Sequence, residues 1–367
     1  MKIQYPDYEN SIANLACSVL KAFGAGAEHA TLPLADSFLK KPHKNTLVIL
    51  LDGMGTRILE KHLDRYGFFR SHLVGSYSSV FPPTTVAATT SMDSGLFPAE
   101  HCWLGWDCYF KEIDRNVTVF RNTVSETGER AAEYFVAWKF CPYQTVADRI
   151  REAGYEAYSV TPFMDPFPQS FEEICDRIAE LCAQDGRKYI YAYWNEPDTT
   201  MHGEGCMSKQ AGDLLERLEE TVEALCGKLK DTQVLITADH GHVDTQNVAI
   251  TGYPRIMECL VRMPSIEPRA LNLFVKEGYE RQLKEEFAKE FGDKFMLLSK
   301  EEVKQRKLFG PGRNHERFDE MVGDYVAVAV SDLTIFNTEE EARGFIGVHA
   351  GMTEAEMMIP LIAVTCP

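Results

Sequence analysis

Six side chains that can bind metal ions stand at the ends of apolar runs or in short loops, and they are Asp52, Asp198, His202, Asp239, His240 and His349. Asp52 ends the apolar run 46–51, and the adjacent Asp239 and His240 follow the apolar run 234–236. Three carboxylates and three imidazoles are enough ligands for two divalent metal ions. Because paired metals activate a nucleophile and clamp the oxygens of a phosphate ester, this set predicts a two-metal hydrolase of phosphate esters.

The ligand types and their spacing narrow the prediction. Two metal ions about 3.5–4 Å apart can hold both the attacking and the leaving oxygen of an in-line displacement. A mixture of imidazoles and carboxylates suits zinc, Zn²⁺, whereas an all-oxygen site would favour magnesium or calcium. Asp198 and His202 are four residues apart and can share one face of a helical turn, and Pro197 suits the start of that turn.

A nucleophile is predicted in the segment 80–90, where a strand stops at Pro82 and Pro83 and a helix of small residues starts. A hydroxyl at that helix N-terminus faces unpaired backbone N–H groups and the positive end of the helix dipole, which suit a phosphate. Thr84 and Thr85 fit this position equally well. A threonine here can also cap the helix, and the two roles are compatible.

The elements that position these residues alternate between strand and helix patterns. We expect strands at 46–51, 75–80, 155–161, 188–194, 233–238 and 360–365, with helical patterns between them, notably at 145–153, 171–183 and 208–230. This alternation predicts an α/β fold, a layered α/β/α core with a mainly parallel sheet. Asp52, Asp198 and Asp239 then fall at carboxyl ends of strands, where such sheets bind ligands.

The segment 255–345 has a different pattern, with alternating runs and a charged helix at 279–291. We interpret it as a smaller α+β lid inserted between His240 and His349. The catalytic core would then consist of residues 1–254 and 346–367.

The net charge and the apolar runs of the chain limit which partners it is expected to bind. The net charge of −17 argues against binding a nucleic-acid polymer, although a metal site can still attract a small anionic substrate. No apolar run approaches the roughly 20 residues that cross a bilayer, so no membrane partner is expected. The N-terminus lacks a signal pattern and the ten cysteines are scattered, which predicts a cytoplasmic protein with reduced thiols. The oligomeric state stays unknown.

Six short phrases, in one order along 46–351, give the chain a family resemblance. They are Leu51-Asp52-Gly53, Phe81-Pro82-Pro83-Thr84-Thr85, Ser94-Gly95-Leu96-Phe97-Pro98-Ala99-Glu100-His101, Pro197-Asp198-Thr199-Thr200-Met201-His202, Ala238-Asp239-His240-Gly241 and Val348-His349-Ala350-Gly351. The chain resembles the alkaline phosphatase superfamily and, within it, the type I phosphodiesterase/nucleotide pyrophosphatase family.

The resemblance implies a role for each matching position. Asp198, His202 and His349 would hold one zinc ion. Asp52, Asp239 and His240 would hold the other. The Phe-Pro-x-x-Thr pattern of the family puts the nucleophile at Thr85, which would form a phospho-enzyme that water then hydrolyses. The implied substrate is a small phosphorylated molecule, such as a nucleotide, with a phosphodiester or pyrophosphate bond.

At one position the sequence departs from the family pattern, and this departure leaves the substrate class undecided. The family carries an asparagine that contacts a phosphate oxygen, and an ungapped alignment from 95–98 places Trp106 there. Trp106 could offer its indole N–H or an aromatic wall, and Arg313 could reach the phosphate from the lid. Alternatives are therefore a phosphomonoesterase or phosphonate hydrolase with the same site, and a non-catalytic protein that binds ligands through its metals.

Overall fold

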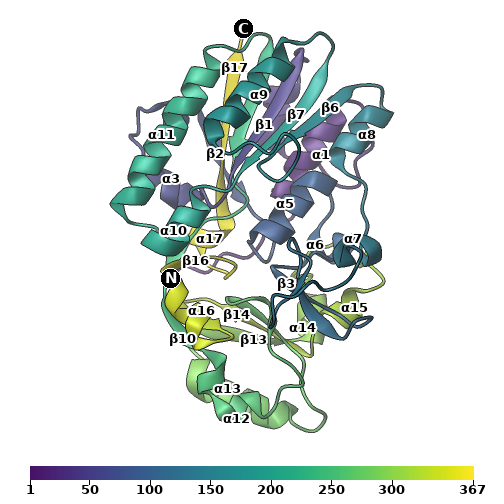
Figure 1. Ribbon diagram of the computed structural model, residues 1–367, viewed down its shortest axis with the longest axis vertical. Coiled ribbons are helices and arrows are strands. Elements are labelled where there is room, and N and C mark those ends of the chain that lie inside the picture. Colours follow the sequence, from purple (N-terminus) through teal and green to yellow (C-terminus); the bar gives the residue numbers. More distant parts are fainter.

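A six-stranded sheet forms the centre of the computed structural model, which describes residues 1–367 (Figure 1). In spatial order its strands are β2 (Leu73–Ser78), β17 (Met358–Cys366), β8 (Thr232–Thr237), β1 (Asn45–Leu51), β7 (Lys188–Trp194) and β6 (Glu156–Val160). The strands β8, β1, β7 and β6 pair in parallel, whereas β17 is antiparallel to both of its neighbours. Because β2 also runs opposite to β17, five of the six strands point the same way. The predicted mainly parallel sheet is confirmed.

Helices cover both faces of this sheet, as the composition of its strands requires. Every residue of β1 and β8 is buried, so neither face can be open to water. In one layer α1 (Ile12–Ala22) packs against α5 (Thr85–Ser94) and α8 (Val146–Glu152). In the other, α11 (Lys209–Cys226) packs against α3 (Thr56–His62) and α9 (Phe171–Ala183). The predicted α/β/α layering is therefore present (Figure 1).

A second, antiparallel sheet lies below the central one in Figure 1. Its strands are, in order, β13 (Phe295–Ser299), β14 (Tyr325–Ala329), β12 (Ala270–Leu273), β11 (Ser265–Glu267), β3 (Asp107–Phe110), β4 (Arg115–Thr118) and β5 (Thr123–Val124). The strands β3–β5 precede the segment 255–345 and join the sheet where Ile266 pairs with Asp107. This sheet thus extends beyond the segment predicted as the lid, and the division into core and lid domains stays a prediction.

The remaining elements complete the chain. They are α2 (Pro33–Leu39), α4 (Phe68–Ser71), α6 (Pro98–His101), α7 (Val136–Phe140), α10 (Asp198–Glu204), β9 (Val243–Asp244), β10 (Gln246–Ala249), η1 (Ile250–Gly252), α12 (Pro254–Met257), α13 (Glu280–Phe291), α14 (Lys300–Gln305), α15 (Phe318–Met321), β15 (Leu333–Phe336), α16 (Glu339–Gly344), β16 (Gly347–Val348) and α17 (Glu354–Met357).

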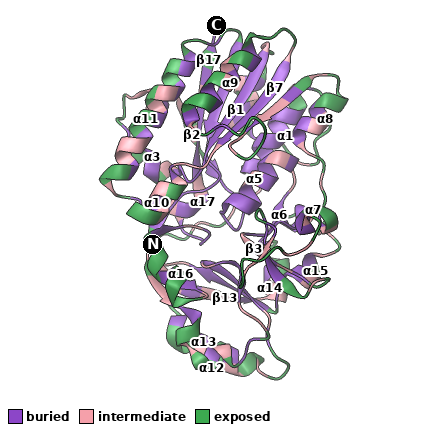
Figure 2. Ribbon diagram, in the orientation of Figure 1, coloured by how far each residue is buried: buried purple, intermediate pink, exposed green.

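Figure 2 shows the burial that this arrangement produces: the central strands are buried, and the outer faces of α8, α9, α11 and α13 are exposed. In α11 the buried residues recur at helical spacing, Ala211, Leu215, Leu218, Val222 and Leu225, which gives one apolar face for the core. All ten cysteines are buried and none forms a disulfide. No helix has both the length and the apolar character needed to span a bilayer.

A fully buried ion pair joins the second sheet to the core. Arg269, just after β11, donates to both carboxylate oxygens of Glu356 in α17, over 2.6 and 2.8 Å. The backbone N–H of Gly351, two residues after His349, donates to the same carboxylate over 2.7 Å. The pair therefore also fixes the segment that carries His349.

Removing one partner of this pair is expected to destabilise the fold strongly. In the Arg269→Met variant the Glu356 carboxylate stays buried without its counter-charge, which costs about 3–5 kcal/mol. Urea unfolding followed by circular dichroism measures the loss. As a control, the double variant Arg269→Met/Glu356→Leu should recover much of the stability, because no lone charge remains. A single variant as stable as the parent would show that the pair contributes little.

Candidate active site

The structure brings all six predicted metal-binding side chains together at the carboxyl edge of the central sheet. Asp52 directly follows β1, and the pair Asp239 and His240 comes two residues after β8 ends. Asp198 and His202 both lie on α10, as the four-residue spacing predicted. His349 follows β16, whose Val348 pairs with Val243 next to these groups. Strand ends that neighbour one another in a parallel sheet are what make the convergence possible.

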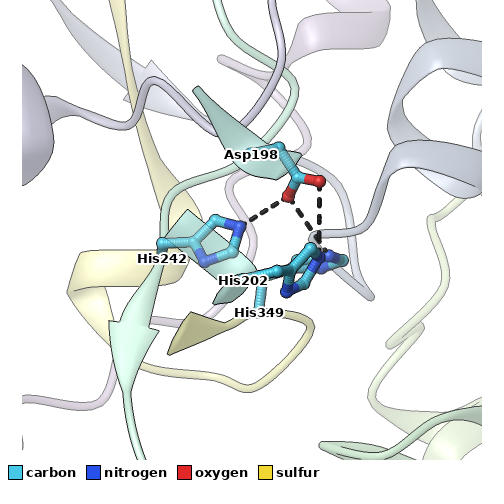
Figure 3. A group of neighbouring side chains, drawn as sticks. All are labelled: Asp198, His202, His242 and His349. Carbon is cyan, nitrogen blue, oxygen red and sulfur yellow. Dashed lines mark hydrogen bonds and ion pairs between the residues drawn. The ribbon is translucent and has the colours of Figure 1, made fainter. Parts of the chain in front are cut away.

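One group of side chains surrounds Asp198 (Figure 3). Its Oδ2 lies 3.3 Å from Nε2 of His202, and its Oδ1 lies 3.7 Å from Nε2 of His349. His242 is the fourth member, with Nε2 at 2.5 Å from Oδ1 of Asp198. Although burial acts to raise the pKa of Asp198, the neighbouring histidines outweigh it and hold that pKa well below its usual range.

A second group of buried side chains, none more than 2% exposed, contains Asp52, Asp239 and His240. Nε2 of His240 lies 3.3 Å from Oδ1 of Asp52 and 3.5 Å from Oδ2 of Asp239. Oδ1 of Asp239 accepts the N–H groups of Gly53 and His240, but its Oδ2 is buried with no hydrogen-bond partner. Burial and the charge of Asp52 both raise the pKa of Asp239. Burial alone would lower the pKa of His240, yet the two carboxylates raise it to about 10.

These groups fit divalent metal ions. Carboxylates packed this closely repel one another, and a buried carboxylate oxygen without a partner is rare unless a cation binds it. The imidazoles of His202, His240 and His349 each turn Nδ1 to a backbone carbonyl, at 2.8, 3.1 and 3.3 Å. That contact fixes the ring and leaves Nε2 free, the usual arrangement of a metal-binding histidine.

The carboxyl edge also positions Thr85. It is the first residue of α5, with Thr84 as the N-cap, so the helix start predicted after Pro82 and Pro83 is confirmed, whereas the strand before it, β2, already ends at Ser78. The Thr85 hydroxyl lies 3.4 and 3.5 Å from the Asp52 oxygens and 3.3 Å from Nε2 of His240. The Thr84 hydroxyl instead donates to Glu267 over 2.5 Å. Of the two candidate threonines, only Thr85 faces the metal-binding groups.

Gly53 allows the two groups to approach each other. Its φ of +74° lies in the left-handed region, and a Cβ there would come within 3.1 Å of Cβ of Asp198 and 3.0 Å of the His242 ring. Any side chain at this position would therefore be strained and would crowd Asp198 and His242.

A cavity of about 580 Å³ opens beside Thr85, lined on one side by α10 and on another by the second sheet. Its walls come from β3–β5 and their loops, β11, and the segment from β15 to His349. Trp106 lines it, and its contact with a substrate stays a prediction. Arg313 is exposed and is not among the lining residues, so the structure does not bring it to the site. The arginine on the cavity wall is Arg121, which lies 5.5 Å above the Trp106 ring.

Three further residues of the site are not among the six predicted metal ligands. Glu267 lines the cavity, and its Oε1 accepts the Thr84 hydroxyl and the Trp106 backbone N–H. Burial raises the pKa of Glu267 to about 7, against the lowering effect of these hydrogen bonds. The Tyr193 hydroxyl donates to Oδ2 of Asp52. The third is His242; its proximity to His240 was the only available signal.

The fold and this site define a metal-dependent hydrolase. The family model for type I phosphodiesterase/nucleotide pyrophosphatase matches residues 46–352, which is most of the chain. The chain therefore belongs to the type I phosphodiesterase/nucleotide pyrophosphatase family. A search of curated protein sequences gives no significant match.

Solved structures show the same fold at low sequence identity. An inactive threonine-to-alanine variant of murine ectonucleotide pyrophosphatase/phosphodiesterase 5, in complex with AMP, is 19% identical, with a TM-score of 0.66 and 88% of each chain covered. The human protein of that name is 18% identical, with a TM-score of 0.66 and 87% of each chain covered. Phosphonoacetate hydrolase from Sinorhizobium meliloti, in complex with phosphonoformate, is 16% identical, with a TM-score of 0.65, 88% of this chain and 90% of the other covered.

Proposed function

We propose that the protein hydrolyses a phosphodiester or pyrophosphate bond of a small phosphorylated molecule, with Thr85 as the nucleophile. The observation that carries this proposal is the Thr85 hydroxyl, which sits between the metal-binding groups and the cavity. The inactive variant of the murine relative, in which a threonine is replaced and AMP is bound, supports both the residue type and a nucleotide-like substrate.

Two zinc ions would complete the site, one held by Asp198, His202 and His349 and the other by Asp52, Asp239 and His240. When bound, such ions lower the pKa of a nearby hydroxyl and offset the charge that develops on phosphoryl oxygens. The residue types support zinc, since imidazole and carboxylate ligands are mixed in both sets.

The chain itself would orient the reaction. The Thr85 oxygen lies within 3.5 Å of Asp52 and His240, beside the ion that these residues would hold. The backbone N–H groups in the first turn of α5 have no partner within the helix and suit a phosphate oxygen. Thr85 Oγ1 loses its proton and bonds to phosphorus while the bond from phosphorus to the leaving oxygen breaks, and that oxygen takes up a proton. Water then cleaves the Thr85 phosphoester and restores the hydroxyl.

Glu267 supports a diester substrate over a monoester. Glu267 lines the cavity, and its Oε1 accepts hydrogen bonds from Thr84 and Trp106, whereas its Oε2 accepts none from the protein. With a pKa of about 7, the carboxyl is ionised in mildly alkaline solution. A monoester carries one more negative charge than a diester, so the carboxylate repels it more.

Turnover of matched nitrophenyl substrates, a phosphate diester and its monoester, tests this proposal. At pH 8.5 we expect the parent protein to prefer the diester in kcat/KM. Glu267→Gln removes the charge but keeps the shape, so the preference should fall by about 10-fold or more. Glu341→Gln, on an exposed carboxylate of the same cavity, is the matched control and should leave the ratio unchanged. An unchanged ratio in Glu267→Gln would exclude charge selection by this residue.

A phosphonate hydrolase is the second candidate function. Arg121 makes no ion pair and could hold a carboxylate of the substrate on the cavity wall, and phosphonoacetate hydrolase shares the fold. The size of the cavity favours a larger leaving group than such a small acid supplies. Phosphonoacetate added to the substrate panel decides between the two, since only the phosphonate hydrolase would release phosphate from it.

A further inference from the structure

His242 is a fourth histidine at the candidate metal centre, beyond the three that the family resemblance assigns. Its side chain is completely buried, and its Nε2 lies 2.5 Å from Oδ1 of Asp198 (Figure 3). Its ring centre is 4.8 Å from that of His202 and 5.0 Å from that of His349. The ring could thus either bind a metal ion itself or support Asp198.

The second ring nitrogen separates these two roles. His202, His240 and His349 each present Nδ1 to a backbone carbonyl, which can accept the proton of a ring whose Nε2 binds metal. Nδ1 of His242 is also buried, but it has no hydrogen-bond partner. In a neutral imidazole only one nitrogen carries the proton.

If Nε2 of His242 bound a metal ion, the proton would have to sit on Nδ1, which has no acceptor among the protein groups around it. A buried N–H without an acceptor is one of the rarest defects in folded proteins, whereas an unpaired acceptor is tolerated more often. With the proton on Nε2, the N–H donates to Asp198 and only a lone pair on Nδ1 stays unpaired. The surroundings of the ring therefore favour a hydrogen-bond donor.

Asp198 needs such a donor because its carboxylate lies near both groups of candidate ligands. Its backbone N–H is fixed by the carbonyl of Asp52 over 3.0 Å, but this contact leaves the carboxylate free to rotate. A hydrogen bond to Oδ1 stops the rotation and leaves Oδ2, at 3.3 Å from Nε2 of His202, pointing to the shared site.

We propose that His242 is a positioning residue that donates its Nε2 proton to Oδ1 of Asp198 and so holds Oδ2 beside Nε2 of His202, where it can bind the metal ion of that site. His242 is not itself a ligand in this arrangement. The inference rests on the metal assignment in the proposed function, and the experiment below separates the two.

The test measures zinc affinity at each of the two sites by competition with a chromogenic chelator, on the full chain. His242→Ala removes the donor and should weaken one site by about 10–100-fold while the other site is unchanged. In His242→Gln the glutamine places an amide N–H near the position of Nε2 but is a poor zinc ligand. The zinc affinity of this variant should therefore stay within a few-fold of that of the parent. His62→Gln, on a histidine of α3 that bonds the Cys206 carbonyl, is the matched control.

Several outcomes would overturn the proposal. If His242→Gln loses as much zinc affinity as His242→Ala, and X-ray absorption finds one imidazole fewer bound to zinc in the variants than in the parent, His242 is a ligand. If neither variant changes zinc affinity, His242 has no part in the site. The zinc affinities of Asp198→Asn are measured in parallel. If Asp198→Asn also leaves the zinc affinity of both sites unchanged, the metal assignment itself fails. If Asp198→Asn loses zinc affinity while the His242 variants do not, only the role of His242 is rejected.

Discussion

Replacing Thr85 with alanine is expected to abolish turnover while the metal content stays at its normal value. Thr85 supplies the only hydroxyl that faces both Asp52 and His240, and loss of a catalytic nucleophile lowers kcat by roughly 10³-fold or more. Because the Thr85 side chain is small and begins a helix, alanine fits there without disturbing the metal-binding groups. Steady-state hydrolysis of the diester substrate and elemental analysis of the same sample measure the two quantities.

Thr89→Ala provides the matched control for this substitution. Thr89 lies one turn further along α5, and its hydroxyl donates only to the carbonyl of Thr85. The chemical change is identical, but no group of the site is removed, so turnover should stay within a few-fold of the parent. Substantial activity in metal-loaded Thr85→Ala would remove Thr85 from the mechanism and direct attention to water as the direct nucleophile.

Asp239→Asn is expected to remove one of the two metal ions and most of the activity. The amide oxygen can still accept the N–H groups of Gly53 and His240, so the local fold survives. At the place of Oδ2, however, the variant presents an NH₂ group, which cannot bind a metal ion. The oxygen that lacks any partner in the present structure is thereby lost. We expect about one zinc ion per chain after dialysis and turnover at least about 10²-fold lower.

Asp93→Asn is the corresponding control, because Asp93 is a partly buried carboxylate on α5 that accepts from Tyr143 and lies outside both ligand groups. It should keep both metal ions. If Asp239→Asn also keeps both, as judged by elemental analysis, Asp239 is not a ligand and its unpaired oxygen needs another explanation.

The core of the fold could be predicted from local sequence patterns because its elements are long and strongly apolar. The strand expected at 188–194 and the helix at 171–183 have the observed bounds of β7 and α9. Asp52 and Asp239 were placed together because each follows a buried run, and parallel neighbours bring such ends to one edge. The site prediction thus depended on topology rather than on any long-range contact.

Contacts between distant segments could not be predicted in this way. The strands β3, β4 and β5 are at most four residues long and join the second sheet through a pairing across more than 150 positions. Glu267 acquires its place through hydrogen bonds to Thr84 and Trp106, which no spacing in the sequence reveals. Arg313 was expected to reach the phosphate from the lid, but its side chain is exposed and does not line the cavity.

The position of β17 has a consequence for how the protein is made. This last strand lies between β2 and β8, so while a ribosome is still extending the chain, β2 has no partner in the central sheet. His349 and Glu356 emerge only shortly before β17, and they complete the ligand set and the buried pair with Arg269. Until β17 has been made, the chain therefore leaves β2 unpaired and the edge of β8 open, and an open strand edge can pair with other chains.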